Sequence, residues 1–147
     1  QSGDDLNRSW GGSENRLTSA VQDRIRGMSF RLCLNLHEDY EGNGMYLYEL
    51  ARGKKKSGLG ETILKSVSKI IAPDSRNLIE GRKARDGIIR PRNRNILPGE
   101  MPEALFLFKQ HTDQSYTLET PSEFDFQRRA DAQLKMIHTA LKVQWSE

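Results

Sequence analysis

Residues 45–71 constrain the fold of this chain most strongly, because they change from a strand pattern to a helix pattern across one short turn. Met45–Ala51 is rich in residues that favour β-strands. Residues 63–71 carry apolar side chains at helical spacing (i, i+1, i+4, i+7 and i+8). Between them lies a basic turn, residues 52–57. The stretch therefore predicts a strand, a basic turn and a helix that Pro73 ends.

The preceding residues predict a helix and a second strand. Apolar side chains at Leu17, Val21, Ile25 and Met28 have helical spacing, and Ser13 is a plausible N-cap. The period then changes to two, because Phe30, Leu32, Leu34 and Leu36 alternate with polar residues and Cys33. A glycine-rich turn at 38–44 suggests that segments 29–37 and 45–51 form a β-hairpin.

The second half of the chain repeats this order after a long connection. Residues 73–103 contain four prolines and six of the 14 arginines, and they predict a long basic loop. Ala104–Phe108 predicts a buried strand, and Tyr116–Glu119 predicts a second strand across a polar turn. The final helix has Thr120 as N-cap, Pro121 at the first helical position and Glu123 in a capping box. Its apolar face comprises Phe126, Ala130, Leu134, Ile137, Leu141 and Trp145.

These elements predict an α+β fold in the order α-β-β-α-long loop-β-β-α. Two hairpins would form a four-stranded antiparallel sheet, with helices packed mainly on one face. We expect residues 1–12 to be an irregular lead-in and residues 13–147 to be one domain with a basic loop at 73–103. Gln1-Ser-Gly3 is typical of the remnant of a cleaved expression tag.

Composition narrows the class of protein. The chain has 147 residues, 35% hydrophobic and 29% charged, which is enough for a single modest core. No apolar run is long enough for a membrane span or a signal peptide. Cys33 is the only cysteine, which excludes an intrachain disulfide and a cysteine-based zinc site. We therefore expect an intracellular protein, nuclear or cytoplasmic, with no membrane contact.

Positive charge is concentrated in two segments, 52–56 and 82–94, which hold 10 of the 23 lysines and arginines. The rest of the chain is net acidic, a pattern associated with binding to polyanions. The glycines around Gly58-Leu-Gly60 do not form a Walker A motif, so we expect no nucleotide cofactor.

Our leading hypothesis is a nucleic-acid-binding domain that contacts the phosphate backbone of RNA or DNA. Lysine and arginine beside a helix N-terminus can neutralise phosphates without reading the sequence. Tyr46 and Tyr48 share one strand face and could stack on bases if that face is open. The predicted contact residues are Arg52, Lys54, Lys55, Lys56, Arg82, Lys83, Arg85, Arg90, Arg92 and Arg94.

Two other functions remain open. The first is a protein-interaction or scaffold module, able to form a homo-oligomer, whose basic loop docks an acidic partner. The second is a metal-dependent nuclease, in which His37, Glu38, Asp39 and Glu41 would approach His111 and Asp113 from adjacent hairpin turns. No spacing typical of catalytic residues supports this site, and Cys33 is best interpreted as a packing residue. We therefore favour a binding module over an enzyme, with no catalytic residue and no metal assigned.

Overall fold

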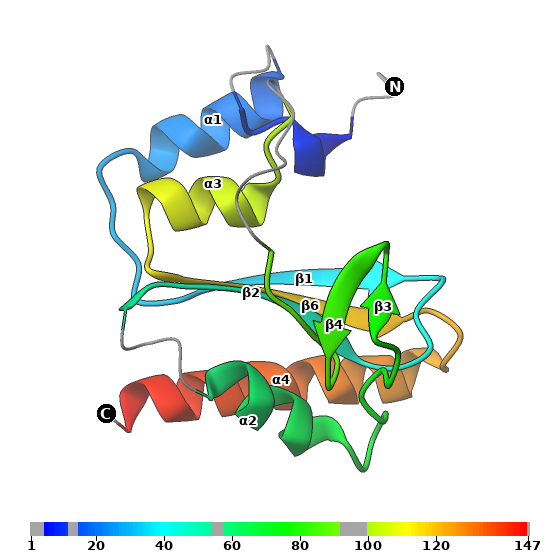
Figure 1. The fold of residues 1–147 in the computed structure, drawn as a ribbon. Coiled ribbons are helices and arrows are strands. Elements are labelled where there is room, and N and C mark those ends of the chain that lie inside the picture. The colour runs from blue at the N-terminus through cyan, green and yellow to red at the C-terminus, as the bar shows by residue number, and fades with distance from the viewer. Residues whose placement is uncertain (1–4, 12–14, 54–57, 92–99, 147) are drawn as a thin grey trace.

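The computed structural model of the chain describes residues 5–11, 15–53, 58–91 and 100–146. A mixed sheet of six strands lies between two layers of helices (Figure 1). Helices α2 and α4 cover one face, which we call the α4 face, and α3 covers part of the opposite α3 face, with α1 beyond it. The elements are η1 (Leu6–Arg8), α1 (Arg16–Ile25), β1 (Cys33–Asp39), β2 (Tyr46–Ala51), α2 (Leu59–Val67), β3 (Leu78–Ile79), β4 (Arg82–Arg85), β5 (Ile88–Ile89), α3 (Glu103–Gln110), β6 (Gln114–Pro121) and α4 (Phe126–Trp145).

The sheet corrects the predicted strand pairing, although the α+β class is confirmed. The strand order is β1-β6-β2-β5-β4-β3. Strand β6 is parallel to β1 and antiparallel to β2, so it separates the two strands that were expected to form the first hairpin. All eight residues of β6 are buried, as a strand with neighbours on both edges and helices on its faces requires. The four-stranded antiparallel sheet is therefore wrong.

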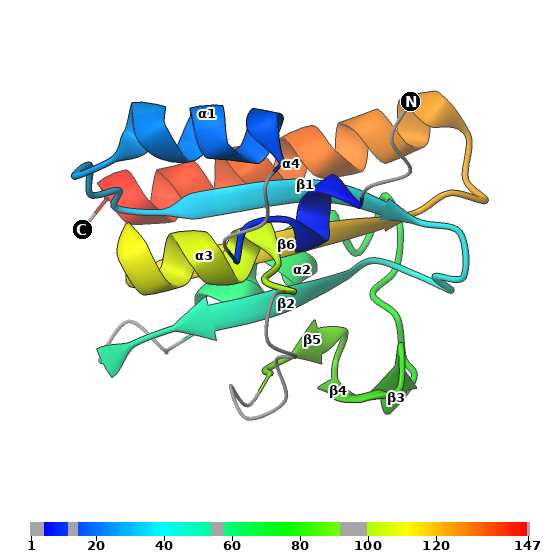
Figure 2. The same ribbon diagram turned by 90° about the horizontal axis from the view of Figure 1, so that it is seen from above.

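The segment predicted as the strand Ala104–Phe108 is helix α3. A short apolar run is compatible with either a buried strand or a buried helix. The helix is favoured here because its apolar residues contact two layers: Leu105 and Phe108 pack on Leu50 of the sheet, whereas Phe106 stacks against Trp10 at 5.3 Å between ring centroids. The prediction that helices lie mainly on one face is thus also wrong (Figure 2).

The connection at 73–103 is more structured than expected. Its described part contains strands β3, β4 and β5, and β5 extends the sheet by pairing in parallel with β2. Turns with positive φ at Glu80-Gly81 and Asp86-Gly87 reverse the chain between these short strands. None of them has the length or the alternating pattern that would identify a strand from sequence.

The helices begin and end differently from the sequence prediction. Asn15 caps α1, accepting hydrogen bonds from the backbone N–H groups of Leu17 and Thr18; the predicted cap, Ser13, lies outside the described residues. Thr120 and Pro121 belong to β6, and Asp125 caps α4 instead, so the predicted capping box is wrong. Among the described residues, every helix is too short or too polar to cross a membrane.

The main core lies on the α4 face. Helix α2 buries Ile63, Leu64 and Val67 against Leu47 and Leu118 of the sheet, as its predicted apolar stripe requires. The face that α4 turns to the sheet overlaps the predicted one at Ile137, which packs against the core, but is otherwise different. It buries Ala132, Met136, Ala140 and Gln144, whereas Phe126, Leu134, Leu141 and Trp145 are exposed.

Gly44 allows the β1–β2 connection to pass close to residues 72–74. A Cβ atom at Gly44 would lie 2.6 Å from the Ala72 carbonyl oxygen and 2.8 Å from the Asp74 nitrogen. Both atoms belong to the backbone, so the clash cannot be relieved by a side-chain rotation. The buried Met45 is hydrogen-bonded to the same segment, donating to the Ala72 carbonyl.

We therefore expect Gly44→Ala to lower the free energy of unfolding by about 2 kcal/mol, in the range observed for overpacking. Urea denaturation measures this change. Gly42→Ala is the matched control, because its Cβ would lie at an ordinary 3.4 Å from its neighbours. Equal stability of the two variants would contradict the close approach at Gly44.

Candidate functional site

The carboxyl ends of β1 and β6 lie beyond the N-terminal end of α3 (Figure 1), and polar side chains gather there on the α3 face. Strand alternation determines which side chains lie there. In β6, Tyr116 and Leu118 belong to the core on the α4 face, so Glu119 lies on the α3 face. The parallel register places His37 of β1 directly beside Glu119. Carboxyl ends of parallel strands are where open α/β sheets usually bind ligands.

His37 and Glu119 form an imidazole–carboxylate pair. The distance from His37 Nδ1 to Glu119 Oε1 is 3.4 Å, and the side chains are 30% and 8% exposed, respectively. The hydrogen bond to the Glu119 carboxylate raises the pKa of His37 above its ordinary value, although burial acts in the opposite direction. The pair therefore favours the protonated imidazole.

Three further carboxylates are linked to this pair, Glu103 and Glu80 by their charge on His37 and Asp39 through Tyr46. The five residues His37, Asp39, Glu80, Glu103 and Glu119 are called the His37 cluster. The charges of Glu103 and Glu80 add to the rise in the pKa of His37. Burial in turn raises the pKa of Glu103, which lies at the start of α3. The cluster thus combines one imidazole with carboxylates from four elements or turns of the fold.

Two tyrosines connect the cluster to the sheet. Tyr46 is fully buried, and its hydroxyl donates a 2.9 Å hydrogen bond to Asp39 Oδ2. The Tyr48 hydroxyl donates to Glu80 Oε2. Burial raises the pKa of both phenols, so they remain protonated donors near neutral pH. The condition for base stacking, an open strand face, is not met at Tyr46, because this side chain has no exposed surface.

Cys33 lies on the same sheet face as His37, but it is buried near α3. Burial raises the pKa of its thiol to about 11, with a further rise from the charge of Glu103. A thiol with this pKa is not a nucleophile near neutral pH. The sequence-based interpretation of Cys33 as a packing residue agrees with this environment.

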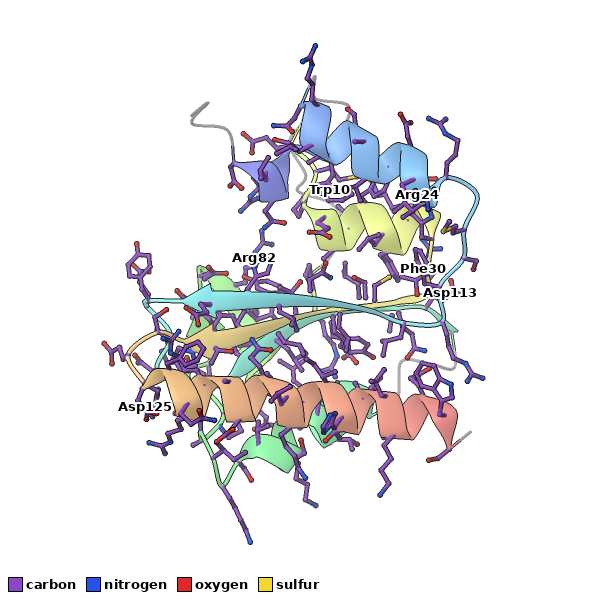
Figure 3. The ribbon with its side chains drawn as sticks, turned by 180° about the vertical axis from the view of Figure 1, so that it is seen from behind. Trp10, Arg24, Phe30, Arg82, Asp113 and Asp125 are labelled. Carbon is purple, nitrogen blue, oxygen red and sulfur yellow. The ribbon has the colours of Figure 1, made fainter. Side chains whose placement is uncertain are left out.

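His111 and Asp113 are not part of the site, contrary to the metal-dependent arrangement considered above. Because β1 and β6 are parallel, the turn before β6 lies near the start of β1, at the opposite end of the sheet from His37. Figure 3 shows Phe30 and Asp113 together at that end, whereas Asp125, which follows β6, lies at the other. The imidazole Nδ1 of His111 is 2.8 Å from the Met28 carbonyl oxygen.

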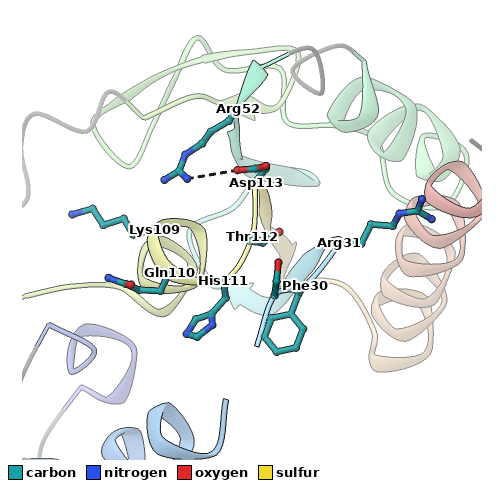
Figure 4. A pocket seen from close by; sticks show the side chains of 9 residues that line it. Phe30, Arg31, Arg52, Lys109, Gln110, His111, Thr112 and Asp113 are labelled. Carbon is teal, nitrogen blue, oxygen red and sulfur yellow. Dashed lines mark ion pairs between the residues drawn. The ribbon is translucent and has the colours of Figure 1, made fainter. Parts of the chain in front are cut away.

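A cavity of about 350 Å³ is found at this opposite end (Figure 4). Arg52 lies above the Phe108 ring, with its Cζ 4.4 Å from the ring centroid, and forms an ion pair of 3.6 Å with Asp113. The cavity is polar, but its charged side chains are already engaged or point outwards (Figure 4). It is lined by Ser29, Phe30, Arg31, Arg52, Lys109, Gln110, His111, Thr112 and Asp113.

The residues predicted to bind nucleic acid are not gathered on one surface in the described part of the chain. Arg90 forms ion pairs with Glu49 and Glu61, and Arg52 with Asp113. Strand β4, which holds the exposed Arg82, Lys83 and Arg85, lies far from the end of β2 that carries Arg52 (Figure 1). Nucleic-acid binding stays a prediction. Lys54, Lys55, Lys56, Arg92 and Arg94 lie outside the described residues.

Sequence reasoning identified His37 and Asp39 as possible ligands but missed Glu119, Glu103 and Glu80. Glu119 had a weak signal, as the acidic last residue of the predicted strand Tyr116–Glu119. Its partner could not be found without the strand pairing. Glu103 and Glu80 have no local signal, because they belong to segments predicted as a loop.

Comparisons with known proteins show the fold. No protein-family model and no curated protein sequence matches the chain. Three crystal structures, each described as a "putative metallopeptidase", are similar. They come from Shewanella amazonensis SB2B (TM-score 0.71, 15% identity, covering 87% of this chain and 46% of that one), Shewanella baltica OS155 (0.67, 17%, 86% and 45%) and Shewanella denitrificans OS217 (0.61, 19%, 74% and 39%). The chain thus spans less than half the length of these proteins.

The electrostatic coupling in the site can be tested with Glu119→Gln. This change removes the charge that favours the imidazolium, so we expect the pKa of His37 to fall back towards its ordinary value of 6.5. NMR titration of the His37 Cε1–H signal measures the pKa. An unchanged pKa in the variant would contradict the pairing.

The same coupling makes stability depend on pH. Because folding raises the pKa of His37, the pair contributes stability below pH 6.5 that is lost as pH rises through the folded pKa. Denaturant unfolding of the wild type and Glu119→Gln across this range should show a smaller pH dependence for the variant. An unchanged dependence would mean that the pair does not contribute.

Proposed function

We propose that this chain carries part of the active centre of a metal-dependent hydrolase, with His37 and Glu119 as its central residues. The observation that supports the proposal is the adjacent imidazole and buried carboxylate at the carboxyl ends of two parallel strands. The fold neighbours described as metallopeptidases favour peptide bonds as the substrate class. Their sequence identity is below 25%, so the activity remains our proposal.

The chemistry of the donor set is compatible with a metal but incomplete. Imidazole is the commonest metal ligand in proteins, and a carboxylate on one ring nitrogen is the usual way to orient it. Since Nδ1 of His37 faces Glu119, Nε2 would hold the metal. A catalytic zinc site needs three protein ligands. The described residues contain no such group of three His, Cys, Asp or Glu side chains, and the chain has no His-Glu-x-x-His motif.

The missing ligands would therefore be supplied from outside the described residues. This agrees with the partial coverage of the fold neighbours, whose chains are more than twice as long as the matched part. A metal held there would polarise the scissile carbonyl and lower the pKa of a bound water. His37 of this chain would then hold the metal, and Glu119 would orient the imidazole.

Glu119 is the candidate positioning residue. Its carboxylate is nearly buried and lies 3.4 Å from Nδ1 of His37, on the opposite side of the imidazole ring from Nε2. In the proposed site, Glu119 Oε1 would accept a hydrogen bond from the Nδ1–H group and so direct the Nε2 lone pair to the metal. His37 must lose its own proton to bind a metal, so its raised pKa predicts that metal affinity decreases as pH is lowered.

The test is hydrolysis of a mixed peptide library by the longest natural polypeptide that contains this sequence, with and without a chelator. We expect Glu119→Gln to lower metal affinity by about 10- to 100-fold, the usual effect of removing a carboxylate that orients a ligating imidazole, and activity at limiting metal should fall with it. His37→Ala should lose bound metal, measured by elemental analysis.

Two exposed residues provide matched controls. His138→Ala and Glu123→Gln make the same chemical changes away from the site, and neither should alter activity or metal content. Hydrolysis that survives the chelator, or full activity of Glu119→Gln at limiting metal, would contradict the proposed function.

A further inference from the structure

We infer that the open edge of β1, together with the outer side of α4, is a docking surface for a βα segment of the natural polypeptide that lies outside these 147 residues. The docking surface is defined by Leu36 on β1 and by Leu134 and Leu141 on α4. These three leucines are 53%, 53% and 39% exposed. The inference stands on burial and topology and does not depend on the proposed function.

The first observation is an apolar stripe that the described fold does not cover. Phe126, Leu134, Leu141 and Trp145 recur at helical spacing, as in a helix packed on a core. Yet α4 buries a different side, centred on Met136, and leaves these side chains exposed. Large apolar side chains gathered on one helix side mark an interaction surface.

The second observation is the sheet edge itself. Within the described residues, β1 pairs only with β6, so its other edge presents backbone N–H and C=O groups without a strand partner. The edge strand has seven residues and no proline, and it pairs in parallel with β6. Parallel strands are normally buried inside a sheet and covered on both faces. The length and parallel pairing of β1, and its lack of proline, therefore leave its outer edge able to accept a further strand.

The two features occur together along one side of the molecule. Figure 2 shows that α1 and α4 both run along the β1 edge, one in each helix layer. The salt bridge from Arg129 to Glu38, and the hydrogen bond from Gln133 Nε2 to the His37 carbonyl, connect α4 directly to β1. Helix α1 carries its own exposed apolar residues, Leu17 and Val21, which are 65% and 46% exposed.

A βα segment fits this surface better than a lone strand or a second copy of the chain. A strand alone would complete the sheet but leave Leu134 and Leu141 in water, because they belong to the helix layer. A following helix would cover them, which is the usual arrangement of a parallel βα unit. A two-fold copy would pair β1 with itself in antiparallel orientation. The fold neighbours, of which this chain covers 39–46%, have enough additional length for such a segment.

The position of the docking surface also concerns the proposed active centre. A strand added in parallel to β1 would end beside His37, where the missing ligands are needed. Only this step rests on the proposed function.

Hydrogen exchange of β1 tests the inference without any measurement of activity. The experiment compares the 147-residue chain with the longest natural polypeptide that contains it. We expect exchange of the 33–39 amides to be slower by at least about tenfold in the longer protein, because the outer edge becomes hydrogen-bonded. The double variant Leu134→Lys/Leu141→Lys should restore fast exchange there, while the same variant of the short chain keeps its circular dichroism spectrum.

Leu78→Lys is the matched control, because Leu78 is 60% exposed on β3 at the opposite edge of the sheet and should leave β1 protected. Equal exchange of β1 in the short and long proteins would overturn the inference. So would protection that rises with protein concentration, which would identify a second copy as the occupant. A natural polypeptide no longer than this sequence would overturn it as well.

Discussion

The position of β6 between β1 and β2 determines the rest of this structure. β6 is the last strand in the sequence, yet its backbone pairs along both edges, with seven positions of β1 and six of β2. Its polar side chains on the α4 face are hydrogen-bonded to α4, Gln114 to Gln144 and Thr120 to Gln133. These bonds satisfy groups that would otherwise be costly to bury. The pairing brings His37, Glu119 and Tyr46 side by side, since Glu119 is opposite both of the others.

The sequence predicted the elements better than their arrangement. The strands at 33–39 and 46–51 and the helices at 59–67 and 126–145 all follow from local periodicity, which records how one element is buried. The partner of an element is a non-local property. The chain enters β6 only after α3, so nothing near Leu36 or Leu47 indicates that another strand separates them. A different ambiguity explains the error at Ala104–Phe108. This apolar run has no clear period, so it is compatible with a strand or a helix, and a strand was predicted.

The site was predicted only in part for the same reason. His37 ends a recognisable strand, and its chemistry made it a candidate ligand. Glu119 can be recognised as the partner of His37 only once β1 and β6 are known to be parallel. An antiparallel pairing would have placed His37 beside the start of β6, away from Glu119. The apolar stripe of α4 shows the complementary case. Its helical periodicity was recognised correctly. Its large side chains Phe126, Leu134, Leu141 and Trp145 nevertheless face outwards, and the described residues do not bury them.

A metal soak followed by diffraction at the zinc absorption edge tests the central claim most directly. It would be performed on crystals of the longest natural polypeptide that contains this sequence. The account predicts an anomalous peak about 2.1 Å from Nε2 of His37, the usual zinc–imidazole distance, with the Glu119 carboxylate on the Nδ1 side of the ring. A zinc ion bound elsewhere, with the His37 imidazole uncoordinated, would contradict the assignment of this pair to a hydrolytic centre.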